Sequence, residues 1–147
     1  MKFGELMSAF GREVGAEGVT PDGEGTCRFQ IEGHEVAFTG ADECERFVTW
    51  AELGELPVNG RSEFMGRLLA AMRVGGEAGD TLFSLFPDTD SLVAYRIMTL
   101  PELDLGGFMD GVEAFCGTLG AWRSRLVDFI PSGMKPSPGA DSGVVRV

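Results

Sequence analysis

The chain has little of what metal centres, disulfide scaffolds and membrane spans require. It contains one histidine, and its three cysteines, Cys27, Cys44 and Cys116, are widely spaced with no CxxC pair. That spacing argues against a disulfide scaffold and favours a reducing compartment. No stretch approaches the roughly 20 apolar residues of a membrane helix, and the opening residues 1–7 lack the apolar core of a signal peptide. We therefore expect a cytoplasmic protein that does not insert into a membrane.

Positive charge is also scarce. Lys and Arg number 12 against 23 Asp and Glu, which gives a formal net charge of −11. Such a surface repels phosphate backbones, so the composition argues against nucleic-acid binding.

Candidates for catalysis are few. The only histidine, His34, lies at a predicted hairpin tip with no convergent partners, so we interpret it as a turn residue rather than a base or metal ligand. The carboxylate pair of Asp88 and Asp90 is typical of an acidic loop. We therefore expect no enzyme activity, no cofactor and no metal. One alternative remains open, a small enzyme that uses Cys44 or Cys116 with His34.

What the chain does have is a clear order of elements. The most informative stretch is Trp50-Ala-Glu-Leu-Gly-Glu-Leu-Pro57, which we interpret as a hinge from an alternating strand into a helix. Three segments around it, 3–14, 64–72 and 105–126, place apolar residues at helical spacing. The expected boundary signals are Gly15 or Gly18 at the end of the first helix, Asn59 or Ser62 as N-cap of the second, and a Thr99 to Glu102 capping box before a third helix that begins near Leu103.

The remaining apolar segments have the alternation or the flanking turns of strands. A first hairpin, a third strand and a second hairpin give the order α-β-β-β-α-β-β-α, and the short connections predict an α+β fold with a largely antiparallel five-stranded sheet. We expect this domain to cover residues 1–130 and the Pro-, Ser- and Gly-rich residues 131–147 to be a disordered tail. The predicted strands are 27–31, 36–38, about 44–51, 81–86 and 91–98.

Apolar surface is the remaining clue to function. Three helices can cover one face of such a sheet, so the opposite face and the second helix need another cover. A second copy of the chain or a bound peptide would supply it.

The pattern resembles the class I chaperones of type III secretion systems, the Tir chaperone family. The features that carry the resemblance span about residues 1–130. They are the opening helix from Phe3 to Val14, the strands 27–31 and 36–38, the Leu53-Gly-Glu-Leu-Pro57 hinge, the Leu68-Leu69 helix, the strand from Leu92 to Leu100 that leads into Pro101, and Trp122 near the end of the last helix.

The resemblance implies a homodimeric chaperone that binds the N-proximal segment of a secreted effector and keeps it secretion-competent without ATP. The effector would add a strand to a sheet edge and place apolar side chains in grooves. The alternative is a protein-binding adaptor or regulator of the same fold that is unrelated to secretion. We expect the effector at Leu6, Phe10, Phe29, Ile31, Phe38 and Trp50, and the dimer contact at Phe64, Leu68, Met72, Leu92 and Tyr95.

Overall fold

The structure is a computed structural model that describes residues 1–134. Its element order confirms the predicted α-β-β-β-α-β-β-α arrangement and the α+β class. The elements are α1 (Phe3–Glu13), β1 (Thr26–Ile31), β2 (His34–Thr39), β3 (Arg46–Glu55), α2 (Arg61–Ala71), β4 (Leu82–Leu85), β5 (Ser91–Thr99), α3 (Leu105–Asp128) and a short 3-10 helix, η1 (Ser132–Met134).

All five strands join one antiparallel sheet in the order β1-β2-β3-β5-β4. The two longest strands, β3 and β5, form its centre and pair from Arg46 opposite Thr99 to Glu55 opposite Ser91. The predicted antiparallel sheet is confirmed. β1 and β4 are its edges, and each has a neighbour on one side only.

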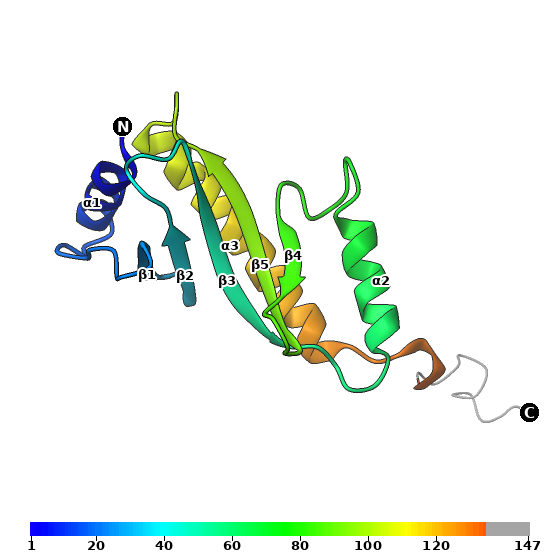
Figure 1. Cartoon of the computed structure of the whole chain (residues 1–147). Helices are drawn as coiled ribbons and strands as arrows, with labels where there is room; N and C mark the ends of the chain where they lie inside the picture. The colour runs from blue at the N-terminus through cyan, green and yellow to red at the C-terminus, as the bar shows by residue number, and fades with distance from the viewer. Residues whose placement is uncertain (135–147) are drawn as a thin grey trace, which may run out of the picture.

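Helices cover one face of this sheet. In Figure 1, α3 crosses behind β3 and β5, α1 lies at the β1 end, and α2 stands beside β4. A cluster of aromatic rings joins α1, β2 and α3: the ring centroid of Phe10 lies 5.0 Å from that of Phe108 and 5.7 Å from that of Phe38. Edge-to-face contacts of this kind add to the burial of the rings. The hydrophobic core therefore lies between the sheet and α1 and α3, and it extends to the buried side of α2 through Phe64 and Leu68.

The Trp50 to Pro57 stretch is not the hinge that the sequence indicates. β3 continues to Glu55, four residues beyond the predicted end at Ala51. A register shift between Glu52 and Gly54 absorbs one residue, and Gly54 takes a φ of 134°, which only glycine adopts without strain. The bulge keeps the strand paired where the Leu-Gly-Glu-Leu pattern suggests a turn.

Two helix starts also differ from expectation. α2 begins after Gly60, which has a φ of 76°, and neither Asn59 nor Ser62 caps it. The N-cap of α3 is Asp104, whose carboxylate accepts a hydrogen bond from the Gly107 N–H at 2.7 Å. The Thr99 to Glu102 capping box is wrong because Thr99 still belongs to β5, where it pairs with β3.

The start of the expected tail contacts α2. The N–H and hydroxyl groups of Ser132 donate hydrogen bonds to the Glu63 carboxylate at 2.9 and 2.7 Å. These bonds, with the Arg67 guanidinium, lower the pKa of Glu63 below its ordinary value. The rest of the predicted disordered tail, residues 135–147, lies outside the described residues.

Candidate partner-binding surfaces

Four of the six side chains expected at the effector lie in the protein interior. Leu6 and Phe38 have no exposed surface, and Phe10 and Phe29 have almost none. They fill the space between α1, α3 and the sheet, so they present no groove to a partner, and the expectation of an exposed surface there is corrected. The helical and strand periodicity correctly identified an apolar side on each of α1, β1 and β2. These apolar sides are buried because they pack together in the core.

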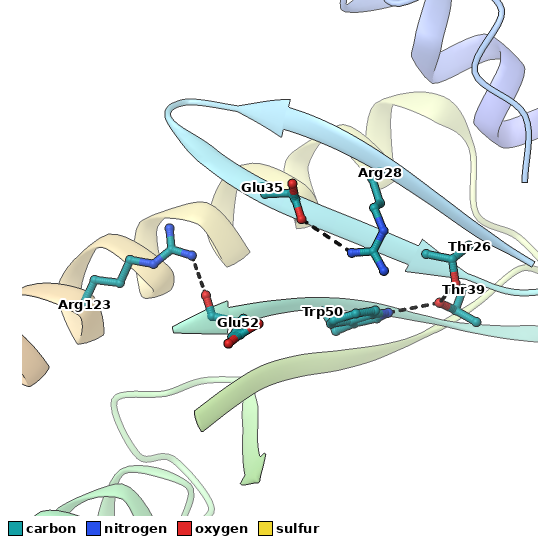
Figure 2. A network of polar contacts seen from close by, with 7 residues as sticks. All are labelled: Thr26, Arg28, Glu35, Thr39, Trp50, Glu52 and Arg123. Atoms are coloured by element: carbon teal, nitrogen blue, oxygen red, sulfur yellow. Dashed lines mark hydrogen bonds and ion pairs between the residues drawn. The ribbon is translucent and has the colours of Figure 1, made fainter. Parts of the chain in front are cut away.

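Ile31 and Trp50 retain exposed surface, and they lie on different sides of the sheet. Ile31 ends β1 and packs against the core. Trp50 lies on the other face, where its indole N–H donates a hydrogen bond to the Thr39 hydroxyl at 3.0 Å (Figure 2). The Arg28 guanidinium lies 5.2 Å from the Trp50 ring centroid, which is cation–π range. A role for Ile31 or Trp50 in binding stays a prediction.

The sheet face that carries Trp50 is not covered by α1 or α3 (Figure 1). Strand pairing places Tyr95 directly opposite Trp50, and the Phe86 ring meets Trp50 edge-on at 5.9 Å. Neighbouring pairs put Val48 beside Ile97, which is half exposed. We call this side of the sheet the open face. It combines large apolar side chains with charged ones such as Arg28 (Figure 2).

The residues expected at the dimer contact divide among three places. Phe64 is buried and meets the rings of Trp122 and Phe129 at 6.1 and 5.1 Å. Tyr95 lies on the open face. The other three, Leu68, Met72 and Leu92, line an apolar groove between α2 and β4.

That groove has a volume of about 110 Å³, and most of its lining is apolar. Its most exposed apolar side chains are Leu69, which is 67% exposed, and Met65, which is 39% exposed. Both lie in the segment 64–72 with apolar residues at helical spacing, but neither was among the residues expected at the dimer contact. Their helical spacing in that segment was the available signal.

The two sheet edges differ in what surrounds them. β4 has four residues, and the α2 groove lies against it. β1 has six residues, and two of them, Arg28 and Gln30, are exposed. An edge strand presents unpaired backbone N–H and C=O groups that can pair with a further strand. The β1 edge can therefore accept a partner strand, whereas β4 adjoins the apolar flank of α2 and its Phe83 N–H already donates to Met72 Sδ at 3.2 Å.

The surroundings of His34 and Cys116 do not activate either side chain for catalysis. The Arg123 guanidinium contacts His34 Nδ1 and donates to the Glu52 carbonyl at 2.6 Å, which ties α3 to β2 and β3 (Figure 2 shows the Glu52 contact). Burial, followed by the Arg123 charge, lowers the pKa of His34. Burial raises the pKa of Cys116 to about 11, so its nucleophilic thiolate form is rare near neutral pH.

Two further kinds of site are missing from the part of the chain that the structure describes. No helix in residues 1–134 is both long and apolar enough to span a bilayer. Within the same residues, no three His, Cys, Asp or Glu side chains lie close enough together to hold a metal ion.

The fold matches those of several solved protein complexes. The first is the ExsC-ExsE complex, with a TM-score of 0.69 and 18% identity over 86% of this chain and 97% of that one. The HopA1-SchA chaperone-effector complex gives a TM-score of 0.64 and 16% identity over 82% and 91% of the two chains. The ExoU-SpcU complex from the type III secretion system of Pseudomonas aeruginosa gives 0.62 and 19% over 82% and 94%. The fold is that of the type III secretion chaperones.

The family follows from the sequence. The model of the Tir chaperone protein (CesT) family matches residues 5–123. The chain belongs to this family, which confirms the resemblance, and it is a type III secretion chaperone. A comparison with curated protein sequences found no match.

Proposed function

We propose that the chain acts in the cytoplasm as a homodimer that binds the N-proximal segment of a type III secretion effector and keeps it secretion-competent. The observation that carries the proposal is the open β1 edge of the sheet in a chaperone of this family. An extended effector segment that adds a strand obtains main-chain hydrogen bonds from the edge and specificity from neighbouring pockets. Such binding needs neither catalysis nor ATP.

The two edges suit different partners. We assign the second copy of the chain to α2 and β4, because apolar side chains such as Leu69 and Met65 are exposed there. An interface between copies has to bury apolar area of this kind to be stable. The effector segment is then assigned to β1, the edge without an exposed apolar helix flank.

A groove near β1 supports this assignment. It has a volume of about 300 Å³ and lies between α1 and the segment that leads into β1. Its lining is mixed, with apolar Met7, Ala16 and Val19 beside the charged Arg12 and Glu17. A Cβ added at Gly11, in the same lining, would lie 3.9 Å from the Phe29 ring of β1. A side chain of an added strand therefore has a recess with apolar and polar walls close to the edge.

Binding without ATP is supported by the glycine-rich segment 75–79. Nucleotide-binding loops present backbone N–H groups and a lysine to the phosphates. No lysine follows here, and Glu77 in this segment forms an ion pair with Arg125 at 2.6 Å. The segment therefore lacks the motif of a nucleotide-binding loop.

Co-expression tests the proposal. In one sample the chain is co-expressed with the N-terminal segment of a candidate effector whose gene lies next to its own. In the second sample it is co-expressed with the same effector without that segment. We expect a soluble complex only in the first case, with two copies of the chain in it by light scattering. An effector segment that stays insoluble, or binding that does not need the segment, would contradict the proposal and favour an adaptor unrelated to secretion.

A further inference from the structure

Helix α2 has two unlike flanks. On the flank toward β4, Met65, Leu69 and Met72 line the apolar groove assigned to the second copy. On the opposite flank, Phe64 and Arg67 line a larger pocket, together with Arg73, which lies two residues beyond the end of the helix. Residues three, four or seven apart share a helix flank, so a single helix can present both surfaces at once. The pocket and the apolar groove share no lining residue.

This pocket lies between α2 and the C-terminal part of α3, and it has a volume of about 520 Å³. Its lining combines aromatic rings with cations, an unusual concentration in a chain that has 12 basic residues and a net charge of −11. We call it the arginine pocket. The lining residues that matter are Phe64, Trp122, Arg67, Arg73, Arg125 and Glu77.

Two of its guanidinium groups are held in place. Arg125 donates to both oxygens of Glu77 at 2.6 and 3.2 Å and lies over the Trp122 ring, 4.6 Å from its centroid. Arg67 donates to Glu63 at 2.6 Å and lies 5.1 Å from the centroid of the Phe129 ring. Stacked and ion-paired guanidinium groups lose little further freedom when a ligand binds.

Arg73 is the arginine of this pocket that has no anionic partner among the described residues. It is exposed, and among residues 1–134 its guanidinium has neither an ion pair nor a hydrogen bond. With three arginines and one glutamate, the lining carries a net positive charge. A carboxylate at Arg73 would gain a charge-assisted hydrogen bond that the free protein does not have.

We propose that the arginine pocket binds an acidic peptide segment of a partner protein. A carboxylate of that segment pairs with Arg73, and an adjacent apolar side chain packs near Ala70 and the aromatic rings that close the pocket. Peptide fits the surroundings better than nucleic acid, because the net charge of −11 repels a continuous polyanion, whereas one or two carboxylates meet only the local positive charge.

The test uses nitrogen-15 NMR of the full chain. The probe is the synthetic peptide acetyl-Ser-Leu-Asp-Glu-Leu-Ser-amide, and its control replaces Asp-Glu with Asn-Gln. The chain has two tryptophans. We expect the acidic peptide to shift the indole N–H signal of Trp122 saturably and to leave that of Trp50, on the open face, unmoved. The control peptide, and acetate at the same carboxylate concentration, produce no saturable shift.

A pair of charge reversals tests the role of Arg73. Arg73→Glu weakens peptide binding by at least about tenfold, which corresponds to about 1.4 kcal/mol. The matched control is Arg46→Glu, because Arg46 is likewise exposed but lies at the start of β3, and it leaves binding within about twofold, allowing for long-range charge effects.

Three results would each overturn the proposal: no saturable shift at Trp122, equal binding of the neutral peptide or of acetate, or equal effects of the two reversals. The probe is not an effector, so this test can fail while the co-expression test succeeds, and the reverse.

Discussion

Replacing Phe38 with glutamate is expected to unfold the protein. The Phe38 side chain has no exposed surface, and its ring centroid lies 5.2 Å from that of Phe108 and 5.7 Å from that of Phe10. A carboxylate there would be buried among aromatic rings without a partner, at a cost of several kcal/mol. Domains of this size have roughly 5–15 kcal/mol of stability in total. Far-UV circular dichroism and urea unfolding measure the loss.

Two milder variants distinguish the loss of a buried ring from the loss of any phenylalanine ring. Phe38→Ala should lower the free energy of unfolding by about 3–5 kcal/mol, the range for large-to-small changes in a core. Phe86→Ala removes the same ring from the open face, where its aromatic contact is with Trp50, and should cost about 1 kcal/mol. A folded Phe38→Glu variant with the unfolding midpoint of the original chain would show that Phe38 is exposed and would restore the groove that the sequence analysis expected.

Replacing Leu69 with glutamate should convert the homodimer into a folded monomer. Leu69 is 67% exposed in the single chain and lies beside Met65 and Met72 in the apolar groove. Covering a side chain of this size contributes about 1.5–3 kcal/mol, and the substitution occurs twice in a dimer. It also places two carboxylates in an apolar interface, where desolvation adds to the loss. Light scattering should report half the original mass, with an unchanged circular dichroism spectrum.

The matched control is Val74→Glu. Val74 lies three residues beyond the end of α2, is fully exposed and does not line the groove. This variant makes the same change in charge and should remain a dimer. If Leu69→Glu remained a dimer as well, the α2 groove would not be the interface, and the open face around Trp50 and Tyr95 would be the next candidate.

The order of elements was predictable because it depends on local patterns. The helical spacing from Phe3 to Val14 and the strand alternation in residues 27–31 can each be recognised within one short segment. Both elements formed where expected. Which apolar faces of these helices and strands pack against each other depends on the fold of the whole chain. Phe10 and Phe38 were assigned to a surface because nothing local shows that α3, about 70 residues after Phe38, brings Phe108 against them.

The binding surfaces show the same limit. The helical spacing of Leu69 in segment 64–72 is visible in the sequence, although Leu69 was not assigned to the dimer contact. The arginine pocket was not visible, because Arg67 and Arg125 are far apart in sequence and meet the same pocket only through the packing of α2 against α3. The end of β3 was misplaced because a bulge at Gly54 has the sequence of a turn.

Hydrogen exchange of the dimer, with and without the N-proximal effector segment, tests the central claim most directly. If the effector adds a strand to the free edge, amides of β1 (Thr26–Ile31) that face solvent in the dimer gain hydrogen-bond partners and exchange more slowly in the complex. Amides of β4 and α2 should be unchanged, because the second copy already covers them. Unchanged exchange in β1, with new protection confined to α2, β4 or the open face, would contradict the account.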